Sequence, residues 1–103
     1  MGSPTKIRAA SKDGVTEVKM QMSHDMENGR RKDASGAVVP AWFITALSVK
    51  CNDRLVLAGE FGTSVSKNPH LVCRFRGGNP GDKIVVSWTD NKGDARRDEA
   101  VVT

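Results

Sequence analysis

The sequence predicts an all-β protein, an immunoglobulin-like β-sandwich of about seven strands. Short segments alternate between apolar and polar residues, with the period of two that a strand with one buried face requires. Turn residues separate these segments at intervals of roughly 8 to 12 residues, as in a sandwich. No stretch has the spacing of an amphipathic helix. A small closed barrel is the alternative architecture.

The first two predicted strands form a hairpin. Residues 5–11 place Ile7 and Ala9 on one face, and residues 15–22 alternate with a period of two. Residues 12–14, Lys-Asp-Gly, supply the turn between them. The face expected to be inward on the second strand carries Thr16, Val18, Met20 and Met22.

Residues 41–50 and 55–61 predict the clearest hairpin, with a turn at residues 51–54. Pro40 suits the start of this first strand, because proline is poorly tolerated inside a central strand. One face of the first strand is expected to carry Phe43, Thr45, Leu47 and Val49, and the other Ile44, Ala46, Ser48 and Lys50. Leu55, Leu57, Gly59 and Phe61 are expected to share one side of the second strand.

Three more strands are predicted, at residues 70–76, 83–89 and 94–102. Residues 90–93 form a hairpin turn between the last two, and residues 77–82 form a glycine-rich loop. The first of these strands is expected to point Leu71, Cys73 and Phe75 inward. We expect residues 5–103 to be one domain and residues 1–4 to be a flexible N-terminus.

Two long loops interrupt the strands, at residues 23–40 and 62–70. Loops of such length in a small domain are usually functional or disordered. The apolar residues Val38, Val39 and Trp42 favour order, because they are able to pin the far end of the first loop. Long loops on a rigid sandwich commonly bind a partner.

The net charge of +4 and the pI of about 9.4 favour an acidic protein or an anionic substrate as partner. Nucleic acid is disfavoured, because the basic residues are scattered among acids and aromatic residues make up only 5% of the chain. No apolar run approaches the length of a membrane span. The N-terminus also lacks the hydrophobic segment of a signal peptide.

Catalytic patterns are weak throughout the sequence. A triad of Ser23, His24 and Asp25 is disfavoured, because the members of a triad are rarely sequence neighbours. His24 with Asp25 and Glu27 makes only a thin set of metal ligands. The stretch at residues 77–81 lacks the lysine and the helix of a phosphate-binding loop. We therefore expect no enzyme activity, no cofactor and no metal site.

The two cysteines, Cys51 and Cys73, are expected to be free, although pairing between them stays open. Cys51 lies in a predicted turn between Lys50 and Arg54, where a lowered pKa would make it a nucleophile. Cys73 is expected to be a small core hydrophobe.

Longer motifs resemble the SoxZ family, a subunit of the sulfur-oxidation carrier complex SoxYZ. Residues 23–29 read Ser-His-Asp-Met-Glu-Asn-Gly, and Arg31-Lys-Asp33 and Pro40-Ala-Trp-Phe-Ile44 follow. Asp25 departs from the family, which more usually has proline after the histidine. The further matching motifs are residues 65–69, 81–83, 88–93 and 98–100.

The resemblance implies an immunoglobulin-like sandwich paired with SoxY, whose C-terminal segment carries sulfur intermediates on a cysteine. This chain ends at Thr103 without such a segment, so it is expected to be the non-carrier subunit. The resemblance also implies the periplasm, reached as a passenger exported with the partner, and transient contact with other Sox enzymes. The residues expected to contact SoxY are His24, Met26, Arg31, Val38, Val39, Trp42, Ser66, Lys67 and Asn68.

Other hypotheses remain open. Arg96 and Arg97, with the basic charge, are compatible with a freestanding module that binds an anionic ligand or nucleic acid. Cys51 is compatible with a small thiol enzyme. An isolated chain with an exposed sheet edge is also expected to be capable of forming a homodimer.

Overall fold

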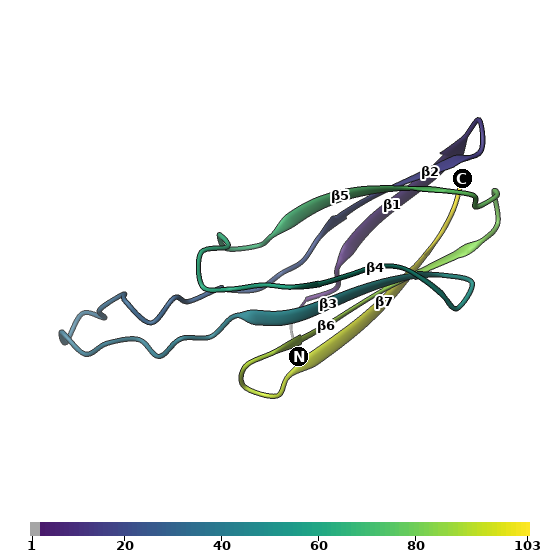
Figure 1. Cartoon of the computed structure of the whole chain (residues 1–103). Coiled ribbons are helices and arrows are strands. Elements are labelled where there is room, and N and C mark those ends of the chain that lie inside the picture. The colour runs from purple at the N-terminus through teal and green to yellow at the C-terminus, as the bar shows by residue number, and fades with distance from the viewer. Residues whose placement is uncertain (1–2) are drawn as a thin grey trace.

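The computed structural model describes residues 3–103, which form seven strands in two antiparallel sheets packed as a β-sandwich (Figure 1). The predicted fold class is therefore confirmed. Of the predicted flexible N-terminus, residues 1 and 2 lie outside the described residues, and Ser3 and Pro4 are exposed. The strands are β1 (Lys6–Lys12), β2 (Val15–Gln21), β3 (Ile44–Cys51), β4 (Arg54–Glu60), β5 (His70–Arg76), β6 (Lys83–Asp90) and β7 (Ala95–Val101).

One sheet has the strand order β1-β2-β5, and the other has β4-β3-β6-β7. The predicted hairpins β1–β2, β3–β4 and β6–β7 are confirmed. The hairpin signals did not predict the long-range pairings of β2 with β5 and of β3 with β6. These pairings decide which loops lie next to each other.

The core lies between the two sheets, where the alternating residues of their inner faces meet. Val18, Met20 and Met22 are at most 1% exposed, as the period of two in their segment predicts. Leu71, Cys73 and Phe75 are half-buried against the same core. The largest side chain in the core is Trp88 of β6, at 2% exposure.

Two irregularities correct the expected faces of β3 and β4. The register of β3 against β6 shifts between Ile44 and Ala46, and Ile44 is fully buried with Leu47 rather than facing away from it. The register of β4 against β3 shifts as well, so that Leu57 opposes Val49 but Leu55 opposes Lys50. An extra residue in one strand reverses the alternation beyond it. Leu55 is consequently 55% exposed.

Cys51 is the last residue of β3 and is buried, whereas the sequence placed it in a turn. Cys51 and Cys73 are both free thiols. Burial, followed by the carboxylate of Asp82, raises the pKa of Cys51, and burial raises the pKa of Cys73. Raised thiol pKa values disfavour the thiolate that a nucleophile needs.

The two long sides of the sandwich differ in whether backbone hydrogen bonds connect the two sheets there. On one side the C-terminus joins β1, because Thr103 N donates to Ala9 O at 2.9 Å and Ser11 N donates to Thr103 O at 3.1 Å. On the other side the edge strands β4 and β5 have no such connection in the sheet order. In the described part of the chain, no helix is long and apolar enough to cross a membrane.

Candidate functional site

A two-stranded ribbon, residues 23–43 and here called the arm, projects from one end of the sandwich and gives the molecule its length of 54 Å (Figure 1). Its two sides pair antiparallel at Glu27 with Trp42 and at Lys32 with Val38. Glu27 N donates to Trp42 O at 2.7 Å, and Trp42 N donates back to Glu27 O at 2.9 Å. Backbone hydrogen bonds therefore order a segment whose sequence lacks strand alternation.

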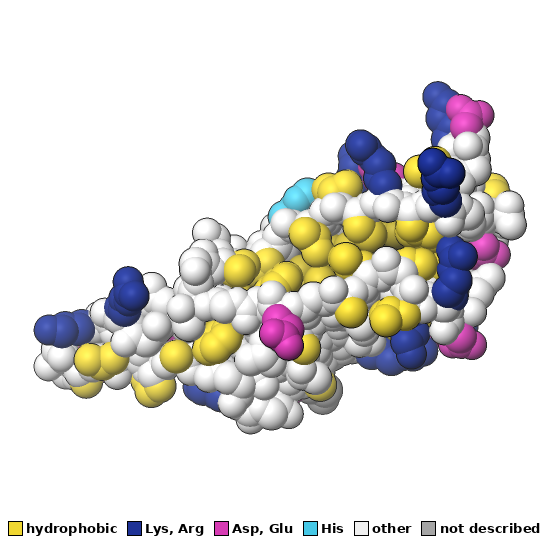
Figure 2. Space-filling model, viewed as in Figure 1, with side chains coloured by type: hydrophobic (Ala, Val, Ile, Leu, Met, Phe, Trp, Pro, Cys, Tyr) yellow, Lys and Arg dark blue, Asp and Glu magenta, His cyan; other side chains and the backbone are white. Residues whose placement is uncertain are grey.

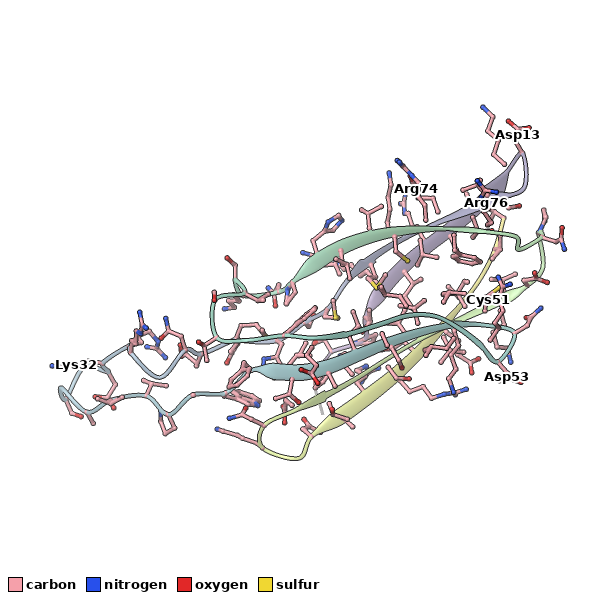
Figure 3. All side chains as sticks on the ribbon, viewed as in Figure 1. Asp13, Lys32, Cys51, Asp53, Arg74 and Arg76 are labelled. Carbon is pink, nitrogen blue, oxygen red and sulfur yellow. The ribbon has the colours of Figure 1, made fainter. Side chains whose placement is uncertain are left out.

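The tip of the arm is a turn organised by Asp33. Its Oδ1 accepts hydrogen bonds from Ser35 Oγ at 2.6 Å, from Ser35 N at 2.9 Å and from Ala37 N at 3.1 Å. These bonds, led by the one from the Ser35 hydroxyl, lower the pKa of Asp33. Gly36 follows with a φ of 85°, which favours glycine. Lys32 stands beside this turn at the end of the molecule (Figure 3).

The base of the arm is anchored by four buried or half-buried side chains. His24 Nε2 lies 3.0 Å from Asp90 Oδ2, and Trp42 Nε1 donates to the same oxygen at 2.7 Å. The His24 ring packs edge-on against Trp42 at 4.9 Å and against Trp88 at 5.3 Å between ring centroids. The first strand of the arm, the second strand of the arm and the end of β6 are thus joined at one point.

The hydrogen bonds define the tautomer of His24. Met26 N donates to His24 Nδ1 at 3.0 Å, so Nδ1 acts as an acceptor and carries no proton. The proton is then on Nε2, which donates to the carboxylate of Asp90. A neutral imidazole whose two nitrogens are both engaged in the fold is a structural group, and it has no free nitrogen for acid–base chemistry.

Asp90 accepts four hydrogen bonds. Besides the two at Oδ2, Oδ1 accepts from Lys92 N and Asp94 N, each at 2.9 Å. Burial alone raises the pKa of this carboxyl. The bonds from His24, Trp42 and the two backbone amides outweigh burial and hold the pKa below its ordinary value.

Met26 completes the base of the arm. It has a φ of 51°, which is unusual for a residue with a long side chain. Its side chain is 6% exposed, and its Sδ accepts a hydrogen bond from Ile44 N at 3.3 Å. This positive φ lies within the first strand of the arm, two residues after His24.

The second long loop, residues 61–69, docks on the first through Asn68. His24 N donates to Asn68 Oδ1 at 3.1 Å, and Asn68 N donates to His24 O at 2.9 Å. Met22 N also donates to Pro69 O at 2.9 Å. The two loops that the sequence singled out therefore form one continuous structure at the same end of the sandwich.

The surface of the arm combines apolar and basic side chains. Val38 is 56% exposed, and Val39 and Trp42 are half-buried. Arg31 donates to both carboxylate oxygens of Glu27, with Nε at 2.9 and 3.0 Å from them. This pair lowers the pKa of Glu27, chiefly through the hydrogen bond. Lys92 Nζ lies 4.6 Å from the centre of the Trp42 ring.

The nine predicted contact residues fall into two groups. His24 and Met26 are buried in the chain's own core, which leaves them little surface for a partner. The other seven are at least partly exposed on the arm or the second loop: Arg31, Val38, Val39, Trp42, Ser66, Lys67 and Asn68.

Asp90 and Asn91 are the residues that the sequence reasoning missed. Both were assigned to a turn, but Asn91 Nδ2 donates to Ala41 O and Asn91 Oδ1 accepts from Phe43 N, each at 2.8 Å. Asp90 and Asn91 hold the arm to the end of β6, although 48 and 50 residues separate Asn91 from its two partners in the sequence. Their only signal was their place in the motif at residues 88–93, because spacing cannot pair them with residues so distant.

Other candidate chemistries find little support in this geometry. His24 is bonded to Asp90 rather than to Asp25. Among residues 3–103, no group of three or more His, Cys, Asp or Glu side chains is arranged to hold a metal ion. Arg96 and Arg97 are paired with Asp98 and Glu99, which reduces their use as a cationic patch.

The sequence matches the model of the sulphur oxidation protein SoxZ over residues 5–101. The chain belongs to the SoxZ family. This confirms the resemblance carried by the motifs at residues 23–44, 65–69 and 88–93. A SoxZ-family chain is a component of the Sox system and a non-catalytic subunit of the SoxYZ carrier, so membership implies a SoxY partner. A search of curated proteins gave no significant match.

Proposed function

We propose that this chain forms a heterodimer with a SoxY-like subunit and that the arm and the second loop supply the contact. The observation that supports this most directly is an apolar strip, the exposed Val38 and the half-buried Val39, on a ribbon anchored by the buried contact of His24 with Asp90. Apolar groups that are presented on a rigid support and are not used by the fold are typical of an interface.

The basic side chains at the tip have a different role in this proposal. Arg30 and Lys32 are exposed, and Lys32 pairs with Val38 across the arm. Charges at the rim of an interface mainly tune the rate and specificity of association. Lys67, on the second loop, extends this basic rim toward the sandwich. The rim suits an acidic surface on the partner.

The proposal includes the cellular context implied by the family. The pair assembles before export, and the chain reaches the periplasm as a passenger of the SoxY-like subunit. It contacts other Sox enzymes transiently, as a support for the subunit that carries sulfur. In the absence of its partner, the chain forms a homodimer through an exposed edge.

Co-expression with a SoxY-like subunit tests the proposal. We expect the two chains to co-purify, and Val38→Asp to weaken the complex by about 10- to 100-fold, because it places a charge at an apolar contact. Val101→Asp is a matched control, since Val101 is 58% exposed on β7, away from the arm. Separate elution of the two unmodified chains at micromolar concentration would refute the heterodimer.

A further inference from the structure

The side of the sandwich between β4 and β5 is open and apolar. β4 pairs only with β3 and β5 only with β2, so both are edge strands, and the second loop connects them. Figure 2 shows hydrophobic side chains gathered between these two strands. On this side, here called the groove, half-buried apolar side chains of β4, the second loop and β5 pack against the core: Val56, Leu57, Phe61, Val65, Leu71, Cys73 and Phe75.

The two ends of the groove are defined by different contacts. At the arm end, the second loop borders an open pocket of about 410 Å³ lined in part by Phe61, Val65 and Leu71. At the other end, Arg54 Nη2 donates to Arg76 O at 3.2 Å, and the guanidinium lies 5.8 Å from the centre of the Phe75 ring. The length between these ends is that of β5, roughly 20 Å for a strand of this kind.

The free edge of β4 offers backbone groups to a further strand. Phe61 N donates to Thr45 O at 2.9 Å, which makes this a hydrogen-bonded pair. Hydrogen-bonded pairs alternate along an antiparallel ladder, so Gly59 and Leu57 also bond to β3. Ala58, between them, therefore turns its N–H and C=O away from β3 and toward the open side.

The charges around the groove distinguish between possible occupants. Arg54, Lys67 and Arg76 are exposed on its rim, against Glu60 and Asp53. Figure 3 shows Arg74 and Arg76 along β5 and Asp53 in the turn before β4. Arg74 is already paired with Glu17. A second copy of this chain would bring the same rim, with its excess of one basic group, against itself, whereas an acidic segment would be attracted.

We propose that the groove between β4 and β5 binds an extended strand of a partner protein, with alternating apolar residues and acidic flanks, which adds to the free edge of β4. Backbone hydrogen bonds supply affinity in such strand addition, and the apolar groove selects alternate side chains. The identification of the partner as the SoxY-like subunit rests on the proposed function. The groove is continuous with the second loop, so one partner can cover both.

Two substitutions test the groove directly. Ala58→Pro removes an outward N–H without breaking the ladder to β3, and Val65→Asp places a charge in the pocket at the arm end. We expect each to weaken binding of a SoxY-like subunit by about 10- to 100-fold in calorimetric titrations. The control Val101→Asp is expected to leave affinity within about twofold. Thermal unfolding of each isolated variant shows whether it is folded.

Cys73 provides a readout that does not depend on these variants. It is half-buried in the groove, whereas Cys51 is 5% exposed. In a Cys51→Ser chain, alkylation by N-ethylmaleimide is followed by the mass of this chain alone, so that it reports Cys73 and not the cysteine of the partner. We expect the partner to slow this reaction by at least about tenfold, because a bound strand blocks access to the thiol.

The possible failures are distinguishable. If the unmodified chain does not bind a SoxY-like subunit, the proposed function is refuted, and so is the identification of this subunit as the partner that binds the groove. If the subunit binds but Cys73 stays equally reactive and both groove variants bind normally, the groove proposal is overturned while the proposed function stands. A homodimer that Ala58→Pro dissociates and that the SoxY-like subunit does not displace would assign the groove to a second copy and would also overturn it.

Discussion

His24 and Asp90 meet in the core at 3.0 Å, although 66 residues separate them in the sequence. Their side chains are 2% and 0% exposed. The contact joins the start of the arm to the end of β6, and Trp42, on the second strand of the arm, donates a hydrogen bond to the same Asp90 oxygen. The geometry resembles a catalytic pair, but the second imidazole nitrogen accepts the Met26 N–H. The pair therefore positions the arm.

Replacing Asp90 with asparagine should destabilise the protein. Asparagine has one acceptor oxygen, so its NH₂ group must face either the two ring N–H donors or the two backbone donors. We expect a loss of about 2 to 3 kcal/mol in the free energy of unfolding, measured by urea denaturation. Asp13→Asn, in an exposed turn, should change stability by less than about 0.5 kcal/mol. A loss at Asp90 no larger than at Asp13 would contradict the role given to this carboxylate.

Acid should destabilise the fold partly through Asp90. Its pKa in the folded chain lies below the ordinary value of 3.8, so the unfolded chain binds more protons as pH falls. The stabilisation is complete above that value and is lost as pH drops through the folded pKa. Urea denaturation between about pH 2 and 5 should show stability falling with pH, and falling less steeply in Asp90→Asn. Equal slopes in the two proteins would exclude this contribution.

Asn68→Ala and Asn68→Gly should separate two effects at the contact between the loops. Both remove the oxygen that accepts the His24 N–H, but only alanine also opposes the φ of 52°. We expect losses of about 1 kcal/mol for glycine and about 2 kcal/mol for alanine in the free energy of unfolding. Alanine as stable as glycine would show that backbone strain at this position is negligible.

Gly78→Ala should be strongly destabilising. A Cβ at this position would collide with Thr16 Oγ1, which is buried and donates to Gly77 O at 2.7 Å. Gly14→Ala is the matched control, because Gly14 has a similar positive φ but nothing within 4 Å of an added Cβ. We expect losses of about 3 kcal/mol and about 1 kcal/mol respectively in thermal or urea unfolding. Similar losses would mean that Thr16 moves aside without cost.

Cys51→Ser should leave sulfur oxidation by a reconstituted Sox system unchanged within about twofold, because burial raises the thiol pKa and disfavours the thiolate. The measurement is thiosulfate oxidation with the variant in place of the unmodified chain. In the folded chain, Cys51 should also react with thiol reagents far more slowly than after unfolding. A large loss of activity by a folded variant would reopen the thiol-enzyme hypothesis.

The local patterns of the sequence were sufficient for most strands. The alternation at residues 15–22 predicted the buried face of β2, and turn residues predicted all three hairpins. The prediction failed where an extra residue changes the alternation, at Ile44 and at Leu55. A bulge depends on how two strands fit together, and neither strand carries that information alone.

The sequence by itself determined the class of fold, the family and the two loops that matter, because strand period, turn chemistry and ordered motifs are local properties. Only the tertiary structure decided that the loops meet, that His24 faces Asp90 and that β4 and β5 leave one side open. These relationships follow from the pairing of β2 with β5 and of β3 with β6. Such pairing is set by burial across the whole core, which no short segment encodes.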